Sequence, residues 1–118
     1  MGMKKRTEKL ILNTLGGLNL DQVISNYFLT ILNYIRKNKI NKLDINLTSD
    51  IFPMLSEEFG IKPTTIETKL VKALRHSFDS VGSKVYFDVI KYEKRISIRK
   101  LIVILIDMIE KEEEKKVK

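Results

Sequence analysis

The chain has 118 residues, of which 43% are hydrophobic, enough to build the core of one domain (residues 1–118) and too few for two. Lysine and arginine number 22 against 15 acidic residues, so the formal net charge is +7 and favours polyanionic partners such as nucleic acid. The absence of cysteine excludes disulfides, thiolate metal sites and cysteine nucleophiles. The longest apolar run, Leu101 to Ile106, is far shorter than the roughly 20 residues of a membrane span, so we expect no membrane association. The basic N-terminus lacks the apolar core of a signal peptide, which favours a cytoplasmic location.

The N-terminal third predicts two helices. Apolar residues between Leu10 and Leu15 indicate a short helix that ends at Gly16-Gly17. Asn19, with Gln22 three residues later, has the pattern of a capping box at the start of a longer amphipathic helix. The positions expected to face the core in that helix are Leu20, Val23, Ile24, Tyr27, Phe28, Ile31, Leu32 and Ile35. The basic connector that follows, residues 36–42, either contacts phosphates or complements the helix dipole.

Residues 53–81 have the pattern of a helix-turn-helix. Pro53 suits the first turn of a helix because no amide partner is needed there. The apolar face of this first helix is formed by Met54, Leu55 and Phe59. Gly60 permits the left-handed conformation that ends a helix, and Thr64 with Glu67 forms a second capping box. A short helix, a tight turn and a longer capped helix are therefore expected in that order.

The second helix of this pair divides into two faces at about 100° per residue. The inner face is expected to contain Ile66, Leu70, Ala73, Leu74, Ser77, Phe78 and Val81, and the outer face Thr65, Thr68, Lys69, Lys72, Arg75, His76 and Asp79. Hydroxyl and basic side chains bind DNA phosphates and the edges of bases, although charged residues also cover any solvated helix. The predicted DNA-binding residues are Lys62, Thr64, Thr65, Thr68, Lys69, Lys72, Arg75 and His76. The threonines, Lys69 and Lys72 are placed nearest the bases, and Lys62, Arg75 and His76 mainly on the backbone.

The same region contains the pair Phe52-Pro53, the pair Thr64-Thr65 and the run Lys72-Ala73-Leu74-Arg75-His76. These residues resemble the recognition helix of the DNA-binding effector domain at the C-terminus of the sporulation master response regulator, the stage-zero A transcription factor family. A weaker similarity covers almost the whole chain. The resemblance implies an all-helical domain that binds short DNA boxes in promoters, with the recognition helix in the major groove and contacts from Lys72 and Arg75.

The chain departs from that family in three respects. Val71 replaces a base-reading glutamate, so a different target sequence is expected, with a thymine-methyl contact as one substitute. The segment between His76 and the last helix is shorter than in the family. No receiver domain precedes the effector domain, so activation by phosphorylation is not implied, and the chain is expected to be a stand-alone relative or a fragment.

The C-terminal third predicts two further helices, which begin at Ser83 and Ser97. The first is expected to bury Val85, Tyr86, Val89 and Ile90, and the second Ile98, Leu101, Ile102, Leu105 and Ile109. Residues 84–92 and 95–106 are also rich in β-branched and aromatic side chains, so a β-hairpin wing is the alternative.

The last predicted helix also carries apolar residues outside its core stripe. These are Val103, Ile104 and Ile106, and they make the Leu101 to Ile106 region a candidate homodimer seam. Residues 84–100 have a surplus of basic side chains that either contact flanking phosphates or form a solvated face. The tail, residues 110–118, is expected to fray.

These patterns predict an all-α fold, a compact domain of five to six helices that contains a helix-turn-helix; a winged helix is the alternative. No catalytic motif or metal-ligand spacing is present, so we expect no enzymatic activity, no catalytic residue, no metal and no cofactor. The predicted function is sequence-specific binding of double-stranded DNA by a nucleoid-associated transcriptional regulator, with RNA polymerase as a candidate partner. The alternatives are a helical protein-interaction module that binds an acidic partner, and a DNA-binding accessory factor of a plasmid or phage.

Overall fold

A computed structural model describes the backbone of residues 3–117 and the side chains of residues 3–114. Its elements are α1 (Lys5–Gly17), α2 (Gln22–Lys37), a π-helical turn η1 (Leu47–Ile51), α3 (Phe52–Phe59), α4 (Pro63–Ile90) and α5 (Ile98–Val117). Between residues 3 and 117 there is no strand, which confirms the all-α prediction. The winged alternative is wrong because residues 84–90 continue α4 and residues 98–106 begin α5.

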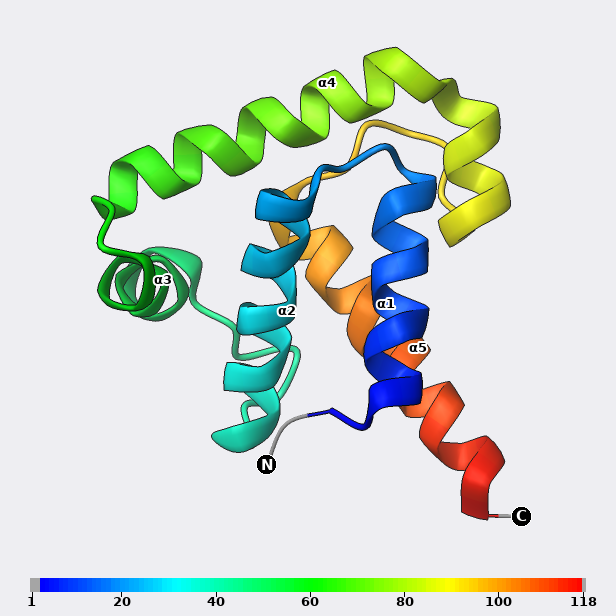
Figure 1. Ribbon diagram of the computed structural model, residues 1–118, viewed down its shortest axis with the longest axis horizontal. Coiled ribbons are helices and arrows are strands. Elements are labelled where there is room, and N and C mark those ends of the chain that lie inside the picture. Colours follow the sequence, from blue (N-terminus) through cyan, green and yellow to red (C-terminus); the bar gives the residue numbers. More distant parts are fainter. Residues whose placement is uncertain (1–2, 118) are drawn as a thin grey trace.

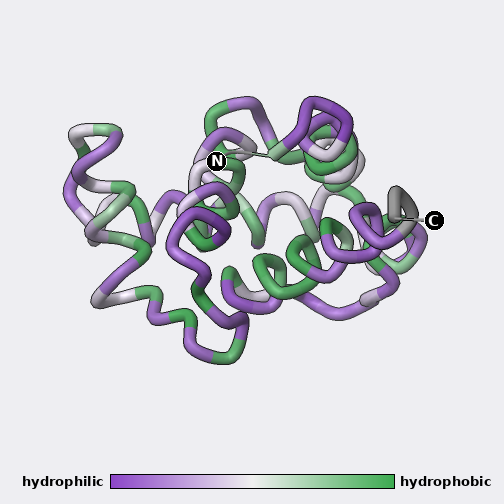
Figure 2. Tube along the Cα trace, turned by 90° about the horizontal axis from the view of Figure 1, so that it is seen from below, coloured by the Kyte–Doolittle hydropathy of each residue, from purple (hydrophilic) through white to green (hydrophobic). Residues whose placement is uncertain are grey.

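Helices α1, α2 and α5 pack against one another, and α4 lies across one end of this group (Figure 1). Helix α3 is seen end-on in that view while α4 runs in the plane, so the two helices cross steeply. The core between them includes the fully buried side chains of Leu15, Phe28, Ile31, Leu101 and Leu105. Hydrophobic and hydrophilic positions alternate around each helix in Figure 2, as expected of amphipathic helices that share one core.

Helix α1 ends at Gly17, as predicted, but the left-handed residue that follows lies two positions later. The helix continues through Gly16-Gly17, and Asn19 is the residue that adopts the left-handed conformation, with φ 60°. The amide of Leu20 then donates to the carbonyl of Leu15 at 3.1 Å, which closes the last turn. The Asn19 side-chain amide donates to the Ser80 hydroxyl at 2.8 Å, so this junction is held against α4.

The start of α2 differs from the predicted capping box. Asp21 is the N-cap, and its carboxylate accepts a hydrogen bond from the Ile24 amide at 2.9 Å. Asn19 cannot serve as the cap because it already forms the end of α1. All the predicted core positions of this segment are buried except Val23, whose exposed fraction is 54%.

Helix α4 contains a break at Gly82, where the backbone has φ 83° and ψ 170°. The break separates residues 63–81 from residues 83–90, in agreement with the predicted new helix after Ser83. Tyr86 and Ile90 in the second part are buried. The Ser77 hydroxyl, also fully buried, donates to the Leu18 carbonyl and lies 2.5 Å from the Tyr86 hydroxyl, so it joins both parts of α4 to the end of α1.

Helix α5 begins as predicted, since the Ser97 hydroxyl accepts from the Lys100 amide at 3.1 Å. All five predicted core positions of α5 are buried: Ile98, Leu101, Ile102, Leu105 and Ile109. Three further side chains, Val103, Ile104 and Ile106, are half-buried within the single chain, so the strongly exposed apolar surface that suggested a dimer seam is not present there. None of the helices described is long and apolar enough to cross a membrane.

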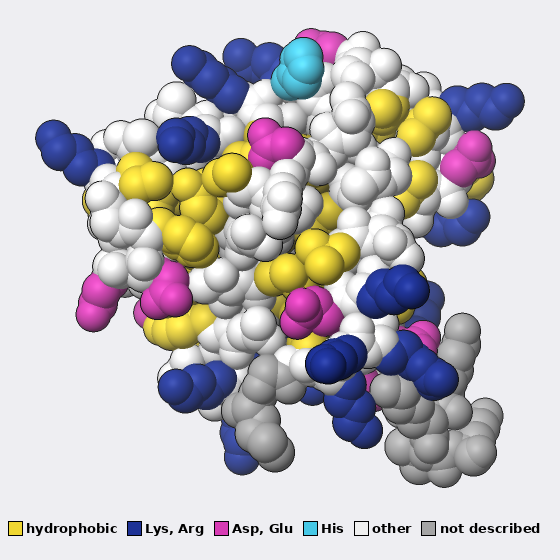
Figure 3. Space-filling view, in the orientation of Figure 1, with side chains coloured by type: hydrophobic (Ala, Val, Ile, Leu, Met, Phe, Trp, Pro, Cys, Tyr) yellow, Lys and Arg dark blue, Asp and Glu magenta, His cyan; other side chains and the backbone are white. Residues whose placement is uncertain are grey.

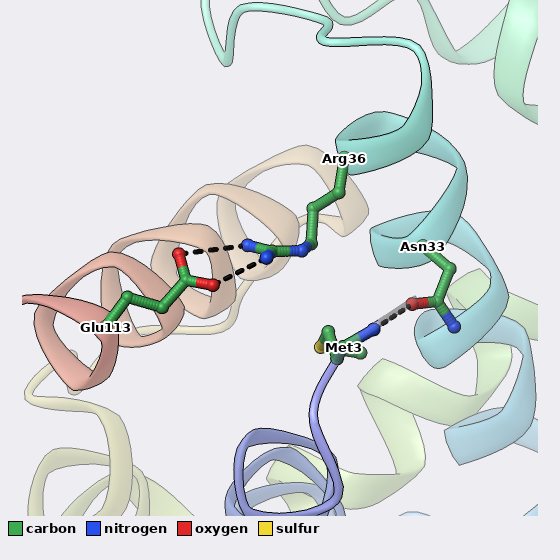
Figure 4. A network of polar contacts seen from close by, with 4 residues as sticks. All are labelled: Met3, Asn33, Arg36 and Glu113. Carbon is green, nitrogen blue, oxygen red and sulfur yellow. Dashed lines mark hydrogen bonds and ion pairs between the residues drawn. The ribbon is translucent and has the colours of Figure 1, made fainter. Parts of the chain in front are cut away.

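The C-terminal tail is helical as far as Val117, where a frayed segment was expected; Lys118 lies outside the described residues. Acidic side chains of α5 from Asp107 onwards bind the end of α2 and the connector after it. Arg36 contacts Glu113 through two hydrogen bonds of 3.1 and 2.5 Å (Figure 4), and Lys42 contacts Asp107 at 2.7 Å and Glu110 at 3.8 Å. In the same region the Met3 amide donates to the Asn33 side chain at 3.1 Å.

Candidate nucleic-acid interface

The turn between α3 and α4 positions the candidate interface. Gly60 ends α3 with φ 67°, and its amide donates to the Ser56 carbonyl at 2.9 Å. Pro63 then occupies the first turn of α4 and needs no amide partner there. Three residues, 60–62, thus connect two steeply crossing helices (Figure 1).

The predicted capping box at the start of α4 is wrong. The helix begins at Pro63 with Lys62 as its N-cap, and no side chain caps it. Thr64 therefore lies inside the first turn, where its carbonyl accepts a hydrogen bond from the Thr68 hydroxyl at 2.9 Å. The Thr68 oxygen keeps free lone pairs, so towards another molecule this hydroxyl can act as an acceptor.

The division of α4 into two faces agrees with the sequence pattern. On the inner side Ile66, Leu70, Leu74 and Ser77 are buried, and Ala73, Phe78 and Val81 are half-buried. All eight predicted DNA-binding residues are exposed: Lys62, Thr64, Thr65, Thr68, Lys69, Lys72, Arg75 and His76. They come from one continuous stretch of helix and its N-cap, so the structure brings them onto one surface, called the α4 face below.

The α4 face is electropositive because its cations have no acidic partners. Among the described residues, no carboxylate pairs with Lys62, Lys69, Lys72 or Arg75. Four cations against the single acid Glu67 give residues 61–76 a net charge of +3. Asp79, at the far end of the face, is bound by Arg95 at 3.2 Å.

The α4 face lies along an edge of the molecule. In Figure 1 residues 63–81 run along the top, with the remaining helices below them. The corresponding edge of the space-filling view carries basic side chains and the histidine (Figure 3). A cylinder of helix on an outer edge can approach a concave partner without a clash from the rest of the fold.

Two exposed valines accompany these polar residues. Val71 is 40% exposed and lies one helical turn from both Thr68 and Arg75. Val23, at the start of α2, borders a shallow hollow that Lys69, Lys72 and His76 also line. Val71 was singled out from the sequence, but Val23 was not, because its spacing matches the buried stripe of α2.

Several cations of two other basic segments are engaged within the fold. Arg36 and Lys42 of the connector bind carboxylates of α5, so for these two residues a structural role replaces the phosphate contact. In the first turn of α5, Arg99 donates to the Ile45 carbonyl, and the Lys100 ammonium lies 5.2 Å from the centre of the Tyr92 ring. The α4 face thus combines unpaired cations with exposed hydroxyls, although Lys5, Arg6 and Lys9 at the start of α1 are also exposed and pair with no carboxylate among the described residues.

No group of three or more histidine, aspartate or glutamate side chains that could hold a metal occurs in the described part of the chain. Comparisons with models of protein families, with curated proteins and with solved structures find no match. The resemblance to the sporulation regulator family therefore stays a prediction from the sequence.

Proposed function

We propose that this protein binds double-stranded DNA in a sequence-dependent manner through the α4 face, as a transcriptional regulator. One observation supports this most strongly: the unpaired cations and the hydroxyls of residues 62–76 share the exposed side of one helix directly after a tight turn. A helix with its side chains is about 10–12 Å wide and fits the major groove of B-DNA, which is about 12 Å wide.

The proposed roles follow from position along α4. The N-terminal part of a recognition helix normally reaches the bases, so Thr65, Thr68 and Lys69 read base edges there. The Thr68 hydroxyl donates within the helix, so it accepts from an amino group of adenine or cytosine. Lys72 and Arg75 lie further along and contact phosphate or guanine.

Val71 contributes shape in place of a hydrogen bond. Its exposed methyl groups lie beside Thr68 and suit the methyl group of thymine. A target that contains thymine opposite this position is therefore expected.

The first test is a selection from random duplexes, followed by fluorescence anisotropy on the selected duplex and a scrambled duplex at two salt concentrations. We expect a preference of at least about tenfold for the selected duplex that persists at the higher salt concentration. The double variant Lys69→Ala/Lys72→Ala should lose about 1–3 kcal/mol of binding free energy for each lysine that reads a base. If both lysines contact phosphate, its affinity should fall by the same factor for all sequences.

The matched control is Lys5→Ala/Lys9→Ala, which removes two exposed lysines from the far end of α1. It has the same net charge as the test variant and should keep the sequence preference. Two results together would contradict the proposal: equal binding to both duplexes that disappears at high salt, and equal losses of affinity in the two double variants. The protein would then bind DNA only as a general polycation. That result would favour a protein-interaction module.

A further inference from the structure

A pocket of about 480 Å³ lies beside the α4 face, between α4, the start of α5 and η1. Its floor is apolar and consists of Leu74, Ile96 and Ile98, all of which are buried. Leu47 and Val71 extend the apolar wall to the rim. The size falls within the range of about 300–1,000 Å³ that is typical of small-molecule sites.

Three arginines line the same pocket: Arg75 from α4, Arg95 from the segment that precedes α5, and Arg99 from the first turn of α5. Arg95 is bound to Asp79, and Arg99 uses one nitrogen to donate to the Ile45 carbonyl. Arg75 pairs with no carboxylate within the described chain. Three guanidinium groups against one carboxylate leave a surplus of positive charge around an apolar floor.

The start of α5 adds to this positive potential. Ser97 is the cap of the helix and lines the pocket together with the first two residues of α5. The N-terminal end of a helix carries partial positive charge from its unpaired amides. Charge from side chains and from the helix therefore acts in the same direction.

We propose that this pocket binds a small anionic amphiphile, a molecule with a compact apolar body and one carboxylate, sulfonate or phosphate group. The apolar body lies on the floor formed by Leu74, Ile96 and Ile98, and the anionic group meets Arg75 and Arg95 at the rim. A DNA phosphate would satisfy the arginines alone and leave the floor unused. This inference does not depend on DNA binding.

The test is a fluorescence titration of the full chain with anilinonaphthalene sulfonate, compared with the uncharged phenylnaphthylamine, which has the same apolar body. We expect one sulfonate site per chain. The neutral analogue should bind about tenfold more weakly, because it lacks one charge-assisted contact. Decanoate should displace the sulfonate and decanol should not.

Two exposed positions supply variants that keep the fold. Val71→Glu places a carboxylate at the rim and should weaken sulfonate binding. Val71→Gln introduces a side chain of nearly the same size as glutamate without the charge and should not weaken it. Arg75→Gln should weaken sulfonate binding by about tenfold. Circular dichroism verifies that each variant is folded. No saturable sulfonate binding to the wild type, or equal affinity in the wild type, Arg75→Gln and Val71→Glu, would overturn the proposal.

Discussion

Gly82 determines the course of α4 through its backbone conformation alone. Its φ of 83° and ψ of 170° belong to a region that is essentially restricted to glycine. Apart from the adjoining residues of the chain, no described atom lies within 4 Å of the place where a Cβ atom would be, so a side chain has space there. The need for glycine is therefore conformational.

Replacing Gly82 with alanine should destabilise the fold by about 1–3 kcal/mol, because the new residue must either adopt a strained conformation or straighten the break. Urea denaturation measures this loss. Gly16→Ala is the control, since Gly16 is helical and a new Cβ there meets no described atom within 4 Å other than its own helix; it should be neutral or stabilising by up to about 1 kcal/mol. Equal effects of the two substitutions would show that the break does not depend on Gly82.

Residues of the left-handed conformation also show where sequence reasoning fails. Gly60 was predicted correctly, because glycine is the usual residue at a helix end. Asn19, Lys39 and Lys91 adopt the same conformation, with φ between 52° and 60°, and end α1, α2 and α4. A lysine has no intrinsic preference for this region, so tertiary packing must impose it, and no local pattern reveals it.

At the scale of elements, the two parts of α4 and the end of α1 depend on one buried polar contact. The Ser77 hydroxyl donates to the Leu18 carbonyl, so the Tyr86 hydroxyl donates to the Ser77 oxygen. The Tyr86 ring also packs edge-on against Phe78, with the ring centres 5.1 Å apart. Three segments that are distant in sequence thus meet at Ser77.

Burial raises the pKa of Tyr86 above its ordinary value near 10. Below pH 10 the residue is protonated in both the folded and the unfolded chain, so its contribution to stability is fully present. As the pH rises further, the unfolded chain ionises first and this contribution is lost. Wild-type stability should therefore fall in the alkaline range partly because of Tyr86.

Tyr86→Phe should cost about 1 kcal/mol at neutral pH through the lost hydrogen bond, and its deficit relative to the wild type should shrink above pH 10. Urea denaturation at neutral and alkaline pH measures both values. Tyr34, whose pKa is also raised by its hydrogen bond to Asp50, is present in both proteins and cancels in the difference. A deficit that stays constant with pH would contradict the assignment.

The faces of α2, α4 and α5 were predictable because burial imposes a helical period on apolar residues. The α4 face followed directly from that period. The helix starts were less predictable: the N-caps are Asp21 and Lys62, where Asn19 and Thr64 were expected. Several polar residues near a helix start can each serve as its cap, and only the course of the backbone decides between them.

At the scale of the whole molecule, long-range ion pairs connect α5 to the end of α2 and the connector after it. The basic connector and the C-terminal tail are far apart in sequence; the connector was expected to contact phosphates or complement the helix dipole, and the tail was expected to fray. In the fold Arg36 meets Glu113 across 77 positions of sequence, with the two side chains 32% and 42% exposed. Pairs this exposed contribute about 0–1 kcal/mol, enough to hold a helix end without determining the fold.

Glu113→Gln should therefore loosen the last turns of α5 and leave global stability within about 1 kcal/mol of the wild type. Hydrogen exchange at the amides of residues 110–117 measures the local effect. Glu114→Gln is the matched control, since it makes the same change at an exposed neighbouring position. The same exchange rates in both variants would mean that the pair with Arg36 does not hold this segment.

Arg75 stands at the border of two surfaces, since it is exposed on the α4 face and also lines the pocket beside α5. One guanidinium cannot pair fully with a DNA phosphate and with an anion in the pocket at the same time. If both sites are used, occupancy of either lowers the affinity of the other by the same factor, as thermodynamic reciprocity requires. A metabolite could then release the protein from DNA by competing for a single side chain, without any change in the shape of the fold.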